Sequence, residues 1–272
     1  MLGAGAMAEA MIDAFCHTGI IAPAQIHVIN RSNQDKLAFL QDKYGVHASS
    51  NLVAAVTDAQ LVLLSVKPKD AETVLKEAAC FAPDHALYLS VVAGKSIEWI
   101  SRIIMQGQAE RATVVSPRVV RTMPNTSCLV RESATAYATS ANCTEADIQI
   151  VETLLRAVGT AYPVKEDQLN AVTGLSGSGP AYFYYMVEAL VKAGTDVGID
   201  ATTSLSLITQ TIYGAAEMLK FTGKTPARLR ADVTSPGGTT MAGITMMEQL
   251  GFEQAVRQAV INATRRAEEL GE

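Results

Sequence analysis

The chain has 272 residues, of which 49% are hydrophobic, and its formal net charge at pH 7 is −5. This length and composition predict a globular protein large enough for two domains, and the lack of an apolar run of about 18 residues argues against a membrane span. The acidic balance argues against nucleic acid and against an anionic membrane surface as partners, so an anionic small molecule would need local positive charge.

The cysteines and the first residues of the chain indicate the expected cellular location. Cys16, Cys80, Cys128 and Cys143 are far apart and belong to no Cys-x-x-Cys pair or histidine cluster. We interpret them as reduced packing residues and expect no metal site. The first five residues carry no basic segment followed by a cleavable apolar core, so we expect no secretory signal and a cytoplasmic location.

The first motif is a glycine-rich turn. Residues 3–8 read G-x-G-x-x-A and lead into residues 9–15, whose small and apolar side chains predict a buried helix. This is the phosphate turn of a dinucleotide-binding βαβ unit, in which the glycines permit a tight turn and close approach of the backbone to the ligand. A second strand, residues 25–32, follows at the spacing that such a unit requires.

The end of that second strand bears on the choice of cofactor. It carries Asn30, Arg31 and Ser32 instead of the Asp or Glu that binds a ribose 2′-hydroxyl. A guanidinium with hydroxyl and amide neighbours suits a 2′-phosphate. The sequence therefore favours NADPH, with NADH as the alternative cofactor.

The strand that ordinarily precedes the phosphate turn is missing. Only Met1 and Leu2 precede Gly3, whereas a strand of about five apolar residues is typical. This strand is central in a doubly wound sheet, so its loss would remove pairing partners from both neighbours and open the core. We therefore expect a start a few codons late or a truncated first strand.

The pattern then alternates between helices and strands. Helices are expected over residues 34–44, 51–57, 69–80, 96–106 and from 144, and strands over 46–48, 61–66, 86–92, 134–140 and within 112–126. Ligands of parallel sheets bind beyond the carboxyl ends of the strands, which is where Ser65, Val66, Lys67 and Pro68 fall. Ala93 and Gly94 end a further strand, and their small size would let a nicotinamide ring lie against the backbone.

Several polar side chains in this half have two interpretations. Lys67 can contact a cofactor phosphate or ribose, or be a solvated loop lysine. Arg121 or Asn125 can face the ligand cleft, although a structural turn explains the Met-Pro-Asn sequence equally well. Thr144 and Asp147 predict a capped helix start with an acidic first turn.

From about residue 162 the chain is expected to be helical. Helices are predicted over residues 168–193, 202–222, 226–231, 241–250 and 253–270. Gly177-Ser178-Gly179-Pro180 can tighten or kink the first of them. Residues 181–191 are apolar nearly all round, which is more than a domain of ~110 residues can bury, so we expect a large helical dimer interface.

The loop over residues 234–240, Thr-Ser-Pro-Gly-Gly-Thr-Thr, opens the helix that follows it. Pro236 cannot continue a helix from behind, and Gly237 and Gly238 allow backbone angles closed to other residues. Unpaired N–H groups and the helix dipole at such a start favour a small carboxylate or a phosphate. An ordinary capped helix is the alternative interpretation.

Together these motifs resemble the pyrroline-5-carboxylate reductase family over essentially the whole chain. The resemblance rests on Gly3-Ala4-Gly5, Asn30-Arg31-Ser32, Val66-Lys67-Pro68, Ala93-Gly94, Met123-Pro124-Asn125-Thr126, residues 171–182 and residues 233–240. It implies an α/β protein with an N-terminal Rossmann (doubly wound) domain, here residues 1–162, and an all-α dimerisation domain, here residues 163–272. It also implies NADPH-dependent reduction of 1-pyrroline-5-carboxylate to L-proline, the last step of proline biosynthesis, by homodimers that are often arranged into a decamer.

The resemblance also assigns site residues. By position, the family holds its dinucleotide at Leu2, Gly3, Ala4, Gly5, Ala6, Met7, Ser32, Asn51, Ser65, Val66, Lys67, Pro68, Val92, Ala93 and Gly94, to which the strand-end argument adds Asn30 and Arg31. It holds its substrate at Glu166, Asp232, Thr239 and Thr240, and the helix-start argument adds Gly238. Asp232 departs from the asparagine of some members, and an inward carboxylate there would repel the carboxylate of the substrate.

One mechanism fits these residues. The N–H groups of Gly238, Thr239 and Thr240 are expected to bind the pyrroline carboxylate and so orient the C=N carbon toward the nicotinamide. Thr240 or an ordered water is the expected proton donor, with Glu166 orienting the ring or its water. Because threonine is a poor acid, we expect Thr240 mainly to donate a hydrogen bond.

Two other functions stay open at this point. A β-hydroxyacid dehydrogenase shares the two-domain plan but needs a lysine on the long interdomain helix, for which Lys192 is the nearest candidate. A non-catalytic, nucleotide-sensing relative is the second alternative, suggested by the missing strand.

Overall fold

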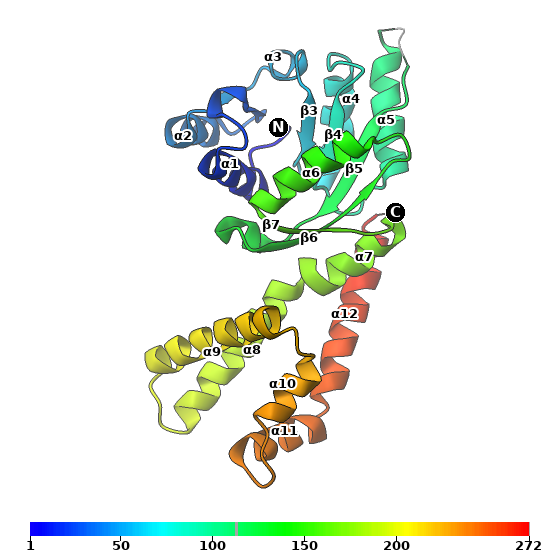
Figure 1. Cartoon of the computed structure of the whole chain (residues 1–272). Helices are drawn as coiled ribbons and strands as arrows, with labels where there is room; N and C mark the ends of the chain where they lie inside the picture. The colour runs from blue at the N-terminus through cyan, green and yellow to red at the C-terminus, as the bar shows by residue number, and fades with distance from the viewer. Residues whose placement is uncertain (112–113, 272) are drawn as a thin grey trace. The chain divides into compact units, whose positions relative to one another are not determined.

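The computed structural model describes residues 1–111 and 114–271. The chain forms two compact units, Met1–Ser178 with Asn262–Glu272, and Gly179–Ile261. Figure 1 shows the elements of both units. Residues 112 and 113, within which a strand was expected to begin, lie outside the described residues.

The first unit is built on a sheet. Its strands are β1 (His27–Ile29), β2 (His47–Ser49), β3 (Leu61–Leu64), β4 (Leu87–Ser90), β5 (Arg118–Met123), β6 (Ser133–Thr139) and β7 (Gly159–Pro163). β1 pairs with β2, and β3 to β7 follow one another in order, with every pairing parallel except that of β5 with β6. This is the doubly wound α/β plan that the alternating sequence pattern predicted.

The segment before the first helix joins the two groups of strands. Leu2 forms parallel bridges with both Ile29 and Leu64 and is fully buried. Its carbonyl accepts the Ser65 N–H at 2.9 Å, and the Gly3 N–H donates to the Ile29 carbonyl at 3.1 Å. Residues 1–3 therefore occupy the central position of the sheet, between β1 and β3. The open core that was expected from the short segment before Gly3 is not observed.

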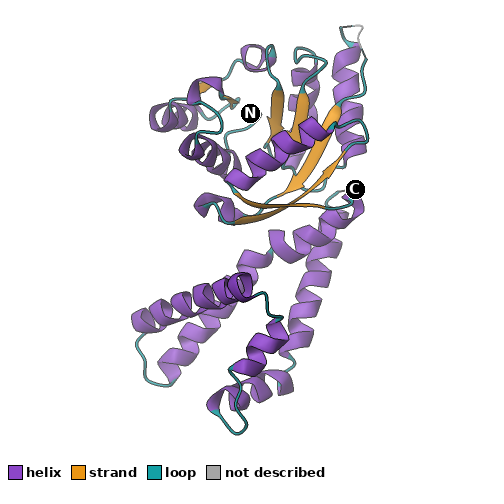
Figure 2. Ribbon diagram, viewed as in Figure 1, coloured by secondary structure: helices purple, strands orange, loops and turns teal. Residues whose placement is uncertain are grey.

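Helices cover both faces of the sheet (Figure 2). One core cluster contains side chains of α1 (Ala6–Thr18), α2 (Gln34–Tyr44) and α6 (Glu145–Ala157), and the other contains those of α3 (Leu52–Val56), α4 (Pro68–Ala79) and α5 (Ile97–Ala109). Along β3, Leu63 belongs to the first cluster, and Val62 and Leu64 belong to the second, as the pleat of a strand requires. Burial on both faces explains why this strand is a continuous apolar run.

Strand β7 was not predicted, because its sequence carries little of the usual strand signal. Ala161 is its one buried residue, while Thr160, Tyr162 and Pro163 are exposed. A proline at the end of an edge strand is tolerated because no ladder hydrogen bond is needed there. The strand predicted over residues 134–140 is therefore not the last strand of the sheet.

The glycine-rich string after β7 interrupts the expected long helix. The helical region begins with a 3₁₀ turn (Glu166–Gln168) and α7 (Leu169–Val172), continues through a π-helical turn (Thr173–Gly177), and resumes as α8 (Gly179–Asp196). The predicted tightening or kink at this string is thus a wider, π-helical turn. Such turns are frequent at functional sites.

The second unit is entirely helical. It holds α8, α9 (Ala201–Thr222), α10 (Pro226–Asp232), α11 (Thr239–Gln249) and most of α12 (Phe252–Glu269). All of these except α8 lie close to their predicted ranges. All residues of this unit are described, and only Gly179 and Ser204 among them are buried. Phe183, Tyr184 and Tyr185 are 55%, 62% and 75% exposed. The unit has no apolar core of its own, as expected for a surface that a partner covers.

The start of α6 is held by a buried carboxylate. The Thr144 hydroxyl accepts the Asp147 N–H at 3.2 Å, and Asp147 Oδ2 accepts the Thr144 N–H and hydroxyl at 2.8 Å each. Asp147 Oδ1 accepts Arg118 Nη1 at 2.7 Å. Burial raises the pKa of Asp147, but these hydrogen bonds and the Arg118 charge outweigh it, so the pKa lies below its ordinary value. The predicted capped helix start is confirmed.

We expect Asp147→Asn to lower the free energy of unfolding at pH 7 by about 1–3 kcal/mol, because an amide replaces a charged acceptor. The folded pKa is depressed, so the contribution of the carboxylate is present above its unfolded pKa of about 4 and is lost as the pH falls through the folded value. Urea unfolding at pH 7 and at pH 3 should show the gap between wild type and variant narrowing in acid. An equal gap at both pH values would contradict this role.

Candidate active site

The phosphate turn leads from Leu2 into α1. Gly3 has a φ of +112°, and a Cβ at this position would lie 2.8 Å from the Ser65 carbonyl oxygen, so only glycine fits. Gly5 is the N-cap of α1 and no side chain caps the helix there. A Cβ on Gly5 would meet no atom within 4 Å. The N–H groups of the first turn of α1 are therefore open to an anion such as a pyrophosphate.

The loop after β3 fixes this turn. The Ser65 hydroxyl donates to the carbonyls of Leu2 at 3.1 Å and Gly3 at 3.3 Å. Val66 packs against the apolar core below the loop. Lys67 is the exposed N-cap of α4, and no described residue forms an ion pair with it. Its ammonium group is thus available to a ligand, as one of its two interpretations requires.

In the loop after β1, one side chain fixes the backbone of the loop and two others are free to contact a ligand. Asn30 Oδ1 accepts the N–H groups of Ser32 at 3.0 Å and Asn33 at 2.9 Å, which fixes the backbone. Arg31 and Ser32 are exposed, and no described side chain pairs with the Arg31 guanidinium. Asn51 caps α3 through a bond from the Ala54 N–H at 3.1 Å. A guanidinium and a hydroxyl are thus presented together on a fixed loop.

The loop after β4 is tightly constrained. Val92 is buried, and its N–H donates to the Ser90 hydroxyl at 3.2 Å. Ala93 is exposed, and Gly94 has a φ of +77°. A Cβ on Gly94 would lie 3.0 Å from the Leu270 carbonyl oxygen. Close packing of the end of α12 therefore excludes a larger residue from this loop.

Glu166, the first residue of the 3₁₀ turn after β7, binds through its side chain to the start of α5, which lies three residues after Gly94. Its Oε1 accepts the N–H of Ile97, the first residue of the helix, at 2.6 Å. Arg121 Nη1 lies 3.4 Å from the same oxygen, and Arg121 Nη2 donates to Asn170 Oδ1 at 3.2 Å. Arg121 is only 7% exposed, so it acts through these partners instead of facing an open cleft. Its role as a partner of Glu166 was not predicted, because the two residues are far apart in sequence.

Asn125 supports the π-helical turn. Its Nδ2 donates to the Ser176 carbonyl at 3.1 Å, its Oδ1 accepts the Ser127 N–H at 3.0 Å, and its own N–H donates to the Ser133 hydroxyl at 3.1 Å. These bonds favour the structural interpretation of Asn125 over a ligand-facing one.

In the second unit, the start of α11 has an open first turn. Gly237 has a φ of +73°, and Gly238 is an N-cap without a side-chain cap, so the ordinary capped helix is not observed. Thr239 and Thr240 form the exposed first turn. The Gly238 N–H, which was expected to be free, donates to the Ser235 carbonyl at 3.0 Å because the turn closes on itself. The N–H groups of the two threonines remain for an anion.

Asp232 is neutralised within the second unit. Its Oδ2 accepts Lys224 Nζ at 2.8 Å, and its Oδ1 lies 2.9 Å from Arg228 Nε. The hydrogen bond from Lys224 is the main reason that the pKa of Asp232 lies below its ordinary value. Two cations therefore compensate the carboxylate that was expected to repel a substrate.

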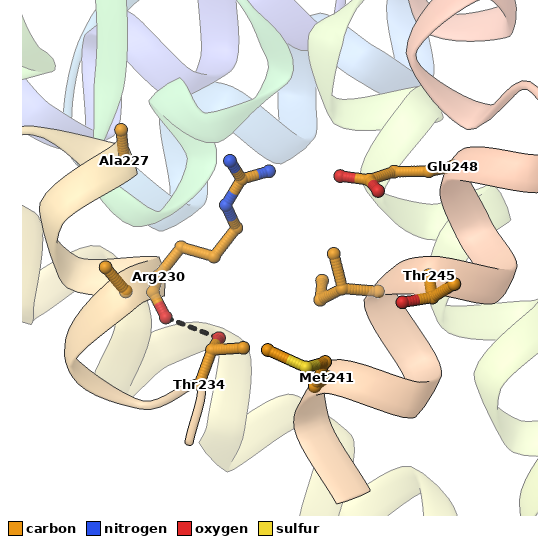
Figure 3. A pocket seen from close by; sticks show the side chains of 8 residues that line it. Ala227, Arg230, Thr234, Met241, Thr245 and Glu248 are labelled. Carbon is orange, nitrogen blue, oxygen red and sulfur yellow. Dashed lines mark hydrogen bonds between the residues drawn. The ribbon is translucent and has the colours of Figure 1, made fainter. Parts of the chain in front are cut away.

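A pocket of about 400 Å³ lies between α10 and α11, next to the loop over residues 234–240 (Figure 3). Arg230 and Glu248 point toward its interior from the two helices. The Thr234 hydroxyl donates to the Arg230 carbonyl at 2.6 Å and so fixes the first residue of the loop. The rest of the lining is Ala227, Ala231, Met241, Ile244 and Thr245.

Metal and membrane features were also sought in the described residues. No group of three or more His, Cys, Asp or Glu residues there could hold a metal ion. The four cysteines are free thiols, and Cys128 is the buried one among them. None of the described helices combines the length and apolarity needed to cross a bilayer.

Comparison with known proteins identifies the family. A family model described as pyrroline-5-carboxylate reductase dimerisation matches residues 166–270, and one described as NADP oxidoreductase, coenzyme F420-dependent, matches residues 1–94. A pyrroline-5-carboxylate reductase of Bacillus spizizenii is 39% identical over 271 residues, which are 100% of this chain and 88% of the relative. The chain belongs to the pyrroline-5-carboxylate reductase family.

Solved structures of the family share the fold. A pyrroline-5-carboxylate reductase from Coxiella burnetii matches with a TM-score of 0.90 and 34% identity, covering 100% of this chain and 97% of the other. The Plasmodium falciparum pyrroline carboxylate reductase, solved with NADP bound, matches with a TM-score of 0.86 and 26% identity at the same coverages. The resemblance inferred from the motifs is confirmed. The match to the dimerisation model, together with the lack of an apolar core in the second unit, supports self-association of this chain.

Proposed function

We propose that this protein catalyses the NADPH-dependent reduction of 1-pyrroline-5-carboxylate to L-proline, the last step of proline biosynthesis. The observation that carries the proposal is similarity over the whole chain to reductases of this name from bacteria, archaea and plants, at 35–39% identity. The open helix start of α1 and the open helix start of α11 both lie in the matched region. The start of α1 would bind a cofactor phosphate, and the start of α11 would bind the substrate carboxylate.

An assay of NADPH oxidation tests this function directly. We expect oxidation with pyrroline-5-carboxylate and accumulation of L-proline, and none in the absence of the imine. Reduction of NADP with a 3-hydroxyacid would favour a β-hydroxyacid dehydrogenase instead. Binding of NADPH without turnover of either substrate would favour a nucleotide sensor.

The residues of the first unit fit NADPH. Residues 2–7 and the first turn of α1 would hold the pyrophosphate, because Gly5 leaves space and no side chain caps the helix. Arg31 and Ser32 would hold the 2′-phosphate, and Val92 to Gly94 would border the nicotinamide. When bound, NADPH supplies the hydride that reduces the C=N carbon. Asn30, Asn51, Ser65 and Pro68 contribute by fixing the loops that present these groups.

The substrate residues are assigned by the same reasoning. The N–H groups of Thr239 and Thr240 bind the carboxylate of the imine, and Gly238 keeps the turn tight enough to present them. The Thr240 hydroxyl donates a hydrogen bond to the single lone pair of the ring nitrogen, and an ordered water in exchange with solvent passes the proton to this nitrogen through that hydroxyl. Glu166 orients the ring or that water. Asp232 supports the site at a distance through its pairs with Lys224 and Arg228.

The exposed apolar side chains of the second unit support assembly with a second copy of the chain. We assign residues 1–162 to the cofactor domain and residues 163–272 to the substrate and dimerisation domain of a cytoplasmic homodimer, with a decamer as its higher assembly. The exposed aromatic side chains on α8 are those that a second copy would cover, because obligate dimer interfaces resemble a divided apolar core.

Arg31 should set the cofactor preference. We expect Arg31→Ala to raise KM for NADPH roughly tenfold, because a charge-assisted bond to the 2′-phosphate is lost, and to leave KM for NADH unchanged. Arg102→Ala, which removes an exposed arginine on α5, is the matched control and should change neither value. Equal changes in KM for both cofactors would show that Arg31 does not contact the 2′-phosphate.

A further inference from the structure

Arg121 is a buried cation with two fixed partners. It lies on β5 and is 7% exposed. One terminal nitrogen lies 3.4 Å from Glu166 Oε1, and the other donates to Asn170 Oδ1 at 3.2 Å. Burying a guanidinium is costly unless its partners are well placed, and an apolar residue would often serve stability as well. The position of this cation therefore calls for a reason beyond stability.

The bonds of Glu166 are unevenly shared between its two oxygens. Oε1 accepts both the Ile97 N–H, at 2.6 Å, and Arg121. No described residue donates to Oε2, and the Glu166 side chain is 33% exposed. One oxygen is thus anchored to the start of α5, three residues beyond Gly94, while the other is available to a ligand or a water.

We propose that Arg121 is a positioning residue for imine reduction: it anchors Oε1 of Glu166 so that Oε2 is presented to the substrate ring or to its water. The inference rests on the proposed function. Arg121 does not itself contact the substrate, because its guanidinium is buried and both of its terminal nitrogens are bound by Glu166 and Asn170. Asn170 completes the arrangement by fixing the second nitrogen of the guanidinium, so that a single orientation of Arg121 is stable.

Arg118 provides a matched control on the same strand. It also pairs with a carboxylate, Asp147, at 2.7 Å, but that carboxylate caps α6 and has no link to Glu166. Loss of Arg118 should lower the melting temperature without changing kcat/KM. Loss of Arg121 should change catalysis beyond any change in melting temperature.

The experiment is a mutant cycle in the full-length enzyme. We expect Arg121→Met to lower kcat/KM for pyrroline-5-carboxylate roughly 10- to 100-fold, as misplacement of a catalytic group does, while the Kd for NADPH stays within about twofold. In the Glu166→Gln background the same change should cost less than about threefold, because two residues that act as a unit are not additive. Arg121→Lys should restore part of the activity, since an ammonium group can reach Glu166 but cannot also hold Asn170.

Asn170→Ala covers the case in which Arg121→Met does not fold, because it keeps the buried charge and frees only one nitrogen. We expect a smaller loss of kcat/KM that is likewise non-additive with Glu166→Gln. Losses that add fully to that of Glu166→Gln, or variants that behave as Arg118→Met does, would overturn the positioning role. A wild-type enzyme that does not turn over pyrroline-5-carboxylate would instead overturn the proposed function, and this inference with it.

Discussion

Thr240→Ala is expected to lower kcat for pyrroline-5-carboxylate roughly 100- to 1000-fold, the usual loss when one preorganised donor to a reacting centre is removed. The open N-terminal turn of α11 places the Thr240 side chain beside N–H groups suited to a carboxylate. NADPH affinity should stay within about twofold, because the cofactor residues lie in the other unit. Steady-state kinetics and a fluorescence titration with NADPH measure the two quantities.

Two controls separate the hydroxyl of Thr240 from the rest of the helix. Thr240→Ser keeps the hydroxyl and should retain most of the turnover. Thr245→Ala removes an exposed threonine further along α11, on the wall of the pocket, and should leave kcat unchanged. Unchanged turnover in Thr240→Ala would refute the assignment of Thr240.

Gly3→Ala should abolish NADPH binding and also destabilise the first unit. The positive φ of Gly3 costs about 1–3 kcal/mol for a residue with a Cβ. In addition, the new Cβ would meet the backbone of Ser65 at 2.8 Å, where nothing can move without disturbing the bridge between β1 and β3. Thermal unfolding and NADPH titration should both show the loss.

Gly5→Ala is the contrasting change at the same turn. Its φ of −74° suits alanine, and the added Cβ would meet no protein atom within 4 Å, so the melting temperature should stay close to that of the wild type. NADPH affinity should nevertheless fall roughly tenfold or more, because the methyl group fills the space through which a pyrophosphate approaches the backbone. Normal NADPH affinity in Gly5→Ala would show that the turn does not hold the cofactor.

Much of the fold follows from local patterns in the sequence. The helices that follow α8 begin and end near their predicted residues, because Gly and Pro mark their boundaries and because long apolar segments fix their type. The helix predicted over residues 168–193 is instead divided by the π-helical turn before α8. The parallel strands β3 and β4 were recognisable as apolar runs. Strand β7 was missed because it is short and half exposed, and the bridging role of Leu2 was missed because a single residue has no periodicity.

The site was predictable only where chemistry is local in sequence. The spacing of the glycines predicted the phosphate turn, and the Pro-Gly-Gly-Thr-Thr sequence predicted the open start of α11. The pairing of Arg121 with Glu166 depends on β5 lying beside the turn that follows β7, which no local pattern encodes. The pair of Arg228 with Asp232 has the i,i+4 spacing of a helix and could have been found from the sequence. The pair of Lys224 with Asp232 and the closed N–H of Gly238 instead depend on turn geometry that the spacing of residues does not reveal.

The most direct test of the account is a crystal structure of the enzyme with NADPH and L-proline bound. We predict that the carboxylate oxygens of proline lie about 2.7–3.2 Å from the N–H groups of Thr239 and Thr240, with the proline ring facing the nicotinamide. A proline carboxylate bound elsewhere, or a start of α11 remote from the nicotinamide in both subunits, would contradict the account.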